Sequence, residues 1–332
     1  GCVMADLRAG LIGLGMMGRH HARVLKSLPG VQLVAVADPG GDVHGVAGGL
    51  EVGATVQHLI DAKVDYAMVA APTIFHEETA LALAEAGIHT MVEKPLAPTE
   101  ESARRIVQAF ADRGLVGAVG HIERYNPALQ NLRARLAEGE LGDVYQVVTR
   151  RQGPFPARIA DVGVVKDLAT HDIDLTAWVT QSPFVSVAAQ TAVKSGREHE
   201  DLVAIVGRLA DGTVTSHLVN WLSPMKERVT IVTGERGAFV ADTLTADLTF
   251  YANGTVRTTW ESLAGFRGVS EGDVTRFAIA KPEPLRTEHE AFRDAVLGKE
   301  ADIVTMEQGL ATVRVAEAAL EAAQTGRTVA LA

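Results

Sequence analysis

Cysteine is nearly absent from this sequence, with Cys2 as the one cysteine among 332 residues. A chain with a single thiol cannot build an internal disulfide framework or a cysteine-based zinc site, and it suits a reducing cytoplasm. Excess positive charge is also lacking, because 41 acidic residues outnumber 31 lysines and arginines and give a formal net charge of −10. Binding of nucleic acid or of an anionic membrane needs phosphate-neutralising Lys and Arg, so we expect neither as a partner.

Long apolar runs are missing as well. No stretch of the sequence approaches the roughly 18 apolar residues of a transmembrane span, and the N-terminus has no basic segment leading into an apolar one. We therefore expect a cytoplasmic protein with a small-molecule partner. Hydrophobic residues make up 47% of the chain and charged residues 22%, which is typical of a globular protein. A length of 332 residues exceeds what one core usually supports, so we expect two domains.

The first third of the chain alternates short apolar runs with helical patterns. The runs read "LRAGLIGLG", "VQLVAVAD", "VDYAMVAAP", "HTMVEKP" and "VGAVGH". This alternation predicts parallel strands that are buried on both faces and joined by right-handed helical crossovers. We expect a doubly wound α/β domain over residues 1–122.

The remainder of the chain, residues 123–332, has a different pattern of long alternating strands. Asp211-Gly212 and Asn253-Gly254 are favoured dipeptides for two-residue hairpins and predict an antiparallel sheet. One helix is expected to end at Gly139, another to cover about residues 167–180, and two more to close the chain, each followed by glycine.

The stretch "AGLIGLGMMGRHHARVL" places a glycine motif where an apolar strand ends and an amphipathic helix begins. Gly13, Gly15 and Gly18 match G-x-G-x-x-G, which predicts a dinucleotide-binding turn in this context. Asp38 follows Gly18 by twenty residues, where it can accept hydrogen bonds from the adenosine ribose, and no Arg or Lys follows to hold a 2′-phosphate. NAD is therefore expected rather than NADP; the alternative is that Asp38 only starts a turn. The expected contacts include the turn residues Met16 and Met17.

Two polar clusters could carry chemistry. Glu93 and Lys94 lie at the C-terminal end of a predicted parallel strand, the edge at which open α/β sheets hold ligands. The ammonium group of Lys94 could polarise a substrate hydroxyl, and the alternative is an ordinary surface lysine. Asp167, His171 and Asp174 are spaced i, i+4, i+7, on one face of the predicted helix. A histidine held by a carboxylate is a reasonable general acid or base, and the alternative is a helix cap beside a structural histidine.

The glycine turn, "EKP" and D-x-x-x-H-x-x-D, in this order, resemble the Gfo/Idh/MocA family of NAD(P)-dependent oxidoreductases over almost the whole chain. The resemblance implies a Rossmann domain followed by an open antiparallel sheet with helices on one face. It also implies a homodimer or homotetramer that forms through the exposed face of this sheet.

The resemblance further implies roles for individual residues. Lys94 and His171 would flank the reacting carbon, Asp167 would support His171, and Glu93 would face the nicotinamide ribose. Further cofactor contacts are implied at Pro72, Thr73 and His76. The family often has Asn where this sequence has Thr73.

A narrower likeness links "GHIERYNPALQNL" and "RRQGPFPARIADVGVVKDLATHDIDL" to the branch described as UDP-N-acetylglucosamine 3-dehydrogenases. Guanidinium groups suit a diphosphate, and Arg150, Arg151 and Arg158 come shortly before the acid/base pair. The alternative is a solvated loop with arginines at the sheet edge. Arg124 and Tyr125 could likewise line the substrate cleft or simply start the linking helix.

The predicted reaction is oxidation of a secondary alcohol on a sugar, at C3 of a nucleotide sugar such as UDP-N-acetylglucosamine. His171 would take the hydroxyl proton and Lys94 would stabilise the alkoxide, although these two roles could be exchanged. The alternatives are a dehydrogenase of a free sugar or inositol, and a non-catalytic dinucleotide sensor. No metal is expected, because no cluster resembles a zinc site.

Overall fold

A computed structural model describes residues 5–157, 162–254 and 272–331, which form two compact units. The first unit contains residues 1–122 and 283–314, and the second contains residues 123–282 and 315–332. The sequence analysis placed residues 283–314 in the second domain, but they fold with the first. The physical reason is helix α8 (Pro284–Val296), which packs against α1 (Gly18–Ser27) and buries Phe292 against Tyr66 with ring centroids 5.4 Å apart.

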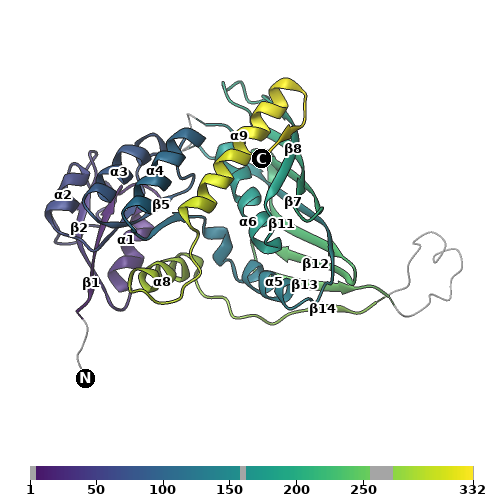
Figure 1. The fold of residues 1–332 in the computed structure, drawn as a ribbon, viewed down its shortest axis with the longest axis horizontal. Coiled ribbons are helices and arrows are strands. Elements are labelled where there is room, and N and C mark those ends of the chain that lie inside the picture. Colours follow the sequence, from purple (N-terminus) through teal and green to yellow (C-terminus); the bar gives the residue numbers. More distant parts are fainter. Residues whose placement is uncertain (1–4, 158–161, 255–271, 332) are drawn as a thin grey trace, which may run out of the picture. The chain divides into compact units, whose positions relative to one another are not determined.

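The sheet of the first unit is parallel throughout its described strands, in the order β3-β2-β1-β4-β5-β6 (Figure 1). Every residue of "YAMV" in β4 is buried, as expected for a strand covered on both faces. This confirms the predicted doubly wound α/β domain. The strands are β1 (Leu7–Ile12), β2 (Val31–Ala37), β3 (Val52–Gly53), β4 (Tyr66–Val69), β5 (His89–Glu93) and β6 (Gly117–Gly120).

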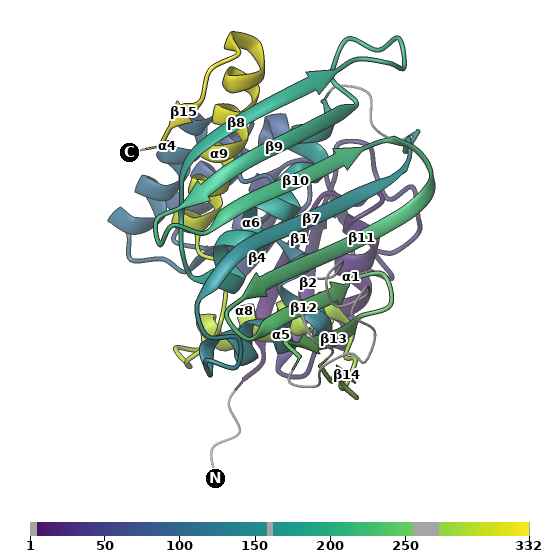
Figure 2. The same ribbon diagram turned by 90° about the vertical axis from the view of Figure 1, so that its right-hand side faces the viewer.

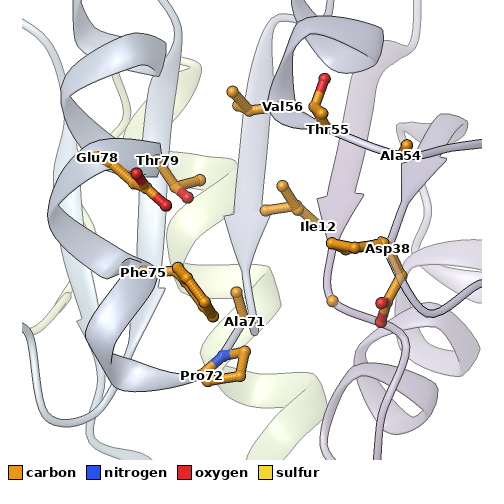
Figure 3. Close-up of a pocket in the computed structure, with 12 residues that line it drawn as sticks. Ile12, Asp38, Ala54, Thr55, Val56, Ala71, Pro72, Phe75, Glu78 and Thr79 are labelled. Carbon is orange, nitrogen blue, oxygen red and sulfur yellow. The ribbon is translucent and has the colours of Figure 1, made fainter.

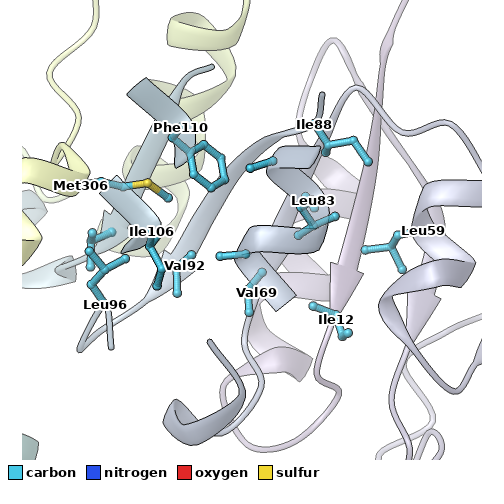
Figure 4. Packing of buried hydrophobic residues seen from close by; sticks show 14 of the residues in the cluster. Ile12, Leu59, Val69, Leu83, Ile88, Val92, Leu96, Ile106, Phe110 and Met306 are labelled. Atoms are coloured by element: carbon cyan, nitrogen blue, oxygen red, sulfur yellow. The ribbon is translucent and has the colours of Figure 1, made fainter. Parts of the chain in front are cut away.

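Helices join these strands and supply the core. The apolar side of α4 packs through Ile106 and Phe110 into the cluster drawn in Figure 4, which Met306 joins from α9. Thr99 caps α4 by accepting a hydrogen bond from the backbone N–H of Ser102, 3.1 Å away. The connecting elements are α2 (Val56–Asp61), η1 (Thr73–Phe75), α3 (His76–Glu85), α4 (Glu100–Asp112) and η2 (Ile122–Tyr125), and α9 spans Met306–Thr325.

The second unit is built on a sheet with the order β14-β13-β12-β11-β7-β10-β9-β8-β15 among its described strands (Figure 2). Its pairs are antiparallel, as expected, except that β7 and β10 are parallel. The strands are β7 (Val144–Pro154), β8 (Phe184–Ala192), β9 (Leu202–Leu209), β10 (Val214–Asn220), β11 (Leu222–Gly234), β12 (Gly237–Asp242), β13 (Asp247–Ala252), β14 (Val274–Arg276) and β15 (Val329–Ala330).

The hairpin prediction is confirmed at Asp211-Gly212, which connects β9 to β10. The strand expected directly after Asn253-Gly254 falls outside the described residues, and β13 instead pairs with β14 farther along the chain. Gly139, with φ of +79°, follows the end of α5 (Pro127–Ala137), as the sequence suggested.

The two faces of this sheet differ. α5 and α6 (Thr170–Thr180) pack on one face, where they contact β12, β13 and β7. Side chains that point to the opposite face include Val206, Leu218 and Tyr251, which are 54%, 48% and 48% exposed.

Candidate functional site

The glycine turn has the geometry of a dinucleotide-binding turn. Gly13 has φ of +99°, and a Cβ placed on it would lie 2.5 Å from the main chain of Ala70 at the end of β4. A Cβ on Gly18 would lie 1.9 Å from the carbonyl oxygen of Gly13, so α1 approaches the turn as only glycine permits. A Cβ on Gly15 would meet nothing within 4 Å. The middle glycine therefore borders open space at the start of α1, where a pyrophosphate fits.

A cavity of about 490 Å³ lies beside this turn (Figure 3). Phe75, Glu78 and Thr79 line one side of it, and Asp38 and Thr55 line the other. A volume of this size is in the range of small-molecule sites. The remaining lining residues are Ile12, Gly13, Pro39, Ala54, Val56, Ala71 and Pro72.

Two hydrogen bonds from main-chain N–H groups fix the orientation of the Asp38 carboxylate. Its Oδ2 accepts from the N–H of Leu14 at 2.8 Å, and its Oδ1 accepts from the N–H of Gly40 at 2.7 Å. Each carboxylate oxygen has a second lone pair, so these bonds leave acceptor capacity for ribose hydroxyls. Asp38 therefore does start a turn, which was the alternative that the sequence left open. The same carboxylate also has a geometry that fits a contact with the ribose.

Pro72 and Thr73 follow β4, and Pro72 lines the cavity. His76 was also expected to contact the cofactor, but it is 1% exposed and its two ring nitrogens face main-chain oxygens. Nδ1 lies 2.9 Å from the oxygen of Pro95, and Nε2 lies 2.9 Å from that of Ala71. Burial lowers the pKa of His76, more than these carbonyls raise it. Its ring joins the loop after β4 to the loop after β5, and the expected contact with the cofactor stays a prediction.

Glu93 and Lys94 lie where β5 ends, as the sequence predicted. Glu93 accepts from the backbone N–H of Lys94 at 3.1 Å through Oε2, while its Oε1 lies 2.6 Å from Nε2 of His21. Burial disfavours ionisation of Glu93, but the hydrogen bond and charge of His21 outweigh this and lower the pKa of the carboxyl. The sequence analysis assigned no chemistry to His21.

Asp167 and His171 lie at the start of the helix that interrupts the second sheet. The expected regular α-helix is not complete, because residues Val165–Ala169 form a π-helical turn and α6 begins only at Thr170. Asp167 therefore lies in the π turn and His171 in the first turn of α6, both half-buried. Single π turns within helices occur frequently at functional sites.

Asp174, the third motif residue, holds Arg124. Nε and Nη2 of Arg124 donate to the two carboxylate oxygens of Asp174 at 3.0 and 2.8 Å, and both side chains are buried. Arg124 and Tyr125 are each 5% exposed. Their expected contact with substrate stays a prediction, whereas the pairing of Arg124 with α6 is a structural role that the sequence did not indicate.

The arginines of "RRQGPFPAR" do not form one cluster. Arg150 and Arg151 are neighbours in β7 and therefore point to opposite faces of the sheet. Arg150 is exposed beside Glu227, while Arg151 is buried and donates to Asp172 and Glu123, each at 3.1 Å. Arg151 is thus paired with two carboxylates of the protein, and the alternation of side chains along a strand would have shown that it diverges from Arg150. The diphosphate contact that the sequence analysis considered for these arginines stays a prediction. Arg158 lies outside the described residues.

Within the described ranges, no group of three His, Cys, Asp or Glu side chains is placed to hold a metal ion. Among the helices of the same ranges, none combines the length and apolar character needed to cross a bilayer.

Comparison with known proteins decides the family. Residues 7–121 match the model described as "Oxidoreductase family, NAD-binding Rossmann fold", and residues 129–240 match the GFO/IDH/MocA C-terminal domain. The chain belongs to the Gfo/Idh/MocA family. The first unit is thus an NAD-binding Rossmann domain, and the protein is an NAD-dependent oxidoreductase of the dehydrogenase type.

Individual relatives of this Gfo/Idh/MocA protein cover most of its length. A UDP-N-acetylglucosamine 3-dehydrogenase from Acidithiobacillus ferrooxidans is 32% identical over 88% of this chain and 90% of its own. A solved structure of the Acidithiobacillus ferrooxidans UDP-N-acetylglucosamine 3-dehydrogenase matches with a TM-score of 0.85, covering 97% and 99% of the two chains. Inositol 2-dehydrogenase 2 from Saccharopolyspora erythraea is 31% identical over 97% of this chain and 94% of its own. GenD2 from gentamicin A biosynthesis, solved in complex with NAD, is 26% identical with a TM-score of 0.81, covering 100% and 98% of the two chains.

Proposed function

We propose that this protein transfers a hydride between NAD and a secondary alcohol of a sugar, at C3 of a nucleotide sugar such as UDP-N-acetylglucosamine. The observation that carries the proposal is the similarity to a UDP-N-acetylglucosamine 3-dehydrogenase over both domains, in sequence and in fold. The preference for NAD over NADP rests on Asp38, whose fixed carboxylate would repel a 2′-phosphate.

The family motifs assign the proton chemistry to the chain's own residues. His171 takes the proton of the substrate hydroxyl, and Asp167, one turn earlier, supports its ring. Lys94 stabilises the negative charge that develops on the substrate oxygen, and Glu93 holds the nicotinamide ribose. NAD bound in this domain would supply the hydride acceptor for the same carbon.

Replacement of His171 tests this assignment. His171→Ala should lower the single-turnover rate by about two to four orders of magnitude and leave NADH affinity unchanged, because the ring acts on the substrate proton. Lys94→Met is the matched variant that tests the alternative in which Lys94 takes the proton and His171 stabilises the alkoxide. If Lys94→Met removes the acidic limb of the pH–rate profile for sugar oxidation, on which the rate falls as the proton acceptor becomes protonated, and His171→Ala retains it, Lys94 is the proton acceptor.

A free polyol is the second candidate substrate. Two observations favour it: the similarity to inositol 2-dehydrogenase 2 over nearly the whole chain, and the burial of Arg151, which takes one guanidinium away from a diphosphate site. Arg158→Ala separates the two substrates, since a UDP-sugar should then show a raised Michaelis constant and myo-inositol should not.

A single-turnover experiment tests the substrate directly. Concentrated protein is mixed with NAD⁺ and, separately, with UDP-N-acetylglucosamine, its uronic acid and myo-inositol, while reduced-nicotinamide absorbance is followed. Reduction of NAD⁺ with a UDP-sugar alone supports the proposal. Reduction of NAD⁺ with myo-inositol alone rejects it in favour of a free polyol as the substrate. Proven NADH binding with no reduction by any of the three would reject both.

We further propose that the protein assembles in the cytoplasm into a homodimer or homotetramer through the face of the sheet that carries Val206, Leu218 and Tyr251. The apolar character and exposure of these side chains support it. Light scattering should give the mass of two or four chains, and Leu218→Glu should reduce it. A wild-type mass of one chain contradicts this assembly.

A further inference from the structure

A chain of one partly buried carboxyl group and two buried imidazoles lies within the first unit, and we call it the Glu93–His21–His289 chain. Nε2 of His21 lies 2.6 Å from Oε1 of Glu93, and Nδ1 of His21 lies 2.7 Å from Nε2 of His289. Both imidazoles are 0% exposed, and their rings meet edge to face with centroids 5.0 Å apart. Three elements distant in sequence, β5, α1 and α8, supply the three side chains.

The geometry fixes the direction of the bond to Glu93. A carboxylate only accepts hydrogen bonds, so Nε2 of His21 carries the proton and donates it. Burial lowers the pKa of His289 well below its usual value, and the neighbouring His21 lowers it further, so His289 is neutral. A neutral His289 can either donate to Nδ1 of His21 or accept from it. The donor to Glu93 is the same in both cases.

Of the two neighbouring carboxyl groups, Glu93 and Glu288, Glu93 is the ionised one. Glu288 is 2% exposed, and its oxygens have no hydrogen-bond partner within the described part of the chain. Burial raises the pKa of Glu288 well above its usual range, and the charge of Glu93 adds to this effect. Glu93 has what Glu288 lacks, namely the imidazole donor and the backbone N–H of Lys94.

We propose that His21 is a positioning residue for the cofactor: its ring holds the Glu93 carboxylate toward the nicotinamide ribose, and His289 fixes the ring. The inference rests on the proposed function, in which Glu93 contacts that ribose. His21 lies one turn after Gly18 on α1, so the helix that begins at the phosphate-binding turn also orients the residue beside Lys94. Loss of the imidazole deprives the partly buried carboxylate of Glu93 of this hydrogen-bond donor, so the carboxylate would rotate or take up a proton.

Affinities for NADH and for ADP test the proposal without any sugar. ADP contains the adenosine and the pyrophosphate but lacks the nicotinamide ribose, so it measures the glycine turn and the Asp38 side alone. We expect His21→Leu to lower the affinity for NADH about tenfold, which is the scale of one hydrogen bond to a charged group. The affinity for ADP should stay within about twofold of the wild type. Glu93→Gln should produce a similar loss, and the double variant should be no weaker than the weaker single variant, because both remove one interaction.

Two controls complete the experiment. His20→Leu changes the neighbouring imidazole on α1 and should alter neither affinity. His21→Gln places an uncharged amide donor near Glu93 and should restore most of the NADH affinity. If His21→Leu does not fold, His21→Ala replaces it, with the same expected loss of NADH affinity and the same retention of ADP affinity.

The outcomes are distinguishable. If His21→Leu lowers the affinities for NADH and ADP equally, the ring only supports α1. If the double variant loses NADH affinity by the product of the two single losses, His21 acts apart from Glu93. Either result overturns the proposal. If Glu93→Gln binds NADH as the wild type does, the assumed ribose contact is absent and the proposal fails at its premise, whatever the sugar substrate is.

Discussion

The contrast between Gly15 and Gly18 gives the sharpest prediction about the cofactor site. Gly15→Ala puts a methyl group into space where nothing of the protein lies within 4 Å, so the free energy of unfolding should be unchanged or raised by up to about 1 kcal/mol. The same methyl group occupies the space assigned to the pyrophosphate. An overpacked contact of about 2 kcal/mol weakens binding about 30-fold.

Gly18→Ala should behave in the opposite way. Its methyl group would lie 1.9 Å from the carbonyl oxygen of Gly13, so α1 or the turn must shift, at a cost of about 1–3 kcal/mol in stability. Urea unfolding and NADH fluorescence titration of both variants separate the two effects. Wild-type NADH affinity in a stable Gly15→Ala protein would refute the placement of the pyrophosphate.

Asp38→Ala should weaken NAD⁺ about tenfold or more and NADP⁺ less, as measured by their Kd values; equal losses would exclude the ribose contact. Asp174→Ala removes the buried carboxylate that pairs with the guanidinium of Arg124 and should lower the free energy of unfolding by about 3–5 kcal/mol in urea, whereas a loss below about 1 kcal/mol contradicts the pairing. Burial lowers the pKa of His217 to about 4, so its neutral form stabilises the fold fully above about pH 6.5 and this contribution is lost as the pH falls toward 4. The wild type should lose about 3 kcal/mol more than His217→Gln over that range, and parallel pH curves would contradict this.

Local patterns in the sequence were sufficient to predict the first domain. Strand runs, the positions of Gly13 and Gly18 and the strand-end placement of Glu93 and Lys94 follow from neighbours in sequence, and the structure has them. The return of α8 to this domain could not be predicted in the same way. Its amphipathic pattern shows that it buries one face, but the partner of Phe292 is Tyr66, more than two hundred residues earlier.

The second domain shows where a motif misleads. The helical spacing of Asp167, His171 and Asp174 suggested one catalytic face, yet Asp174 is committed to a buried arginine and the helix begins with a π turn. Likewise His21 looked like an ordinary helix residue, because its partners Glu93 and His289 come from distant segments. Charge pairs formed by tertiary contacts leave no periodic signal in a single sequence.

The measurement that tests the central claim most directly follows the hydride itself. UDP-N-acetylglucosamine carrying deuterium at C3 is mixed with excess protein and NAD⁺, and the reduced cofactor is analysed by mass spectrometry. The account predicts NADH that is one mass unit heavier than NADH formed from unlabelled sugar, together with a 3-keto sugar product. NADH without deuterium, or no NADH from a protein that binds the cofactor, would contradict it.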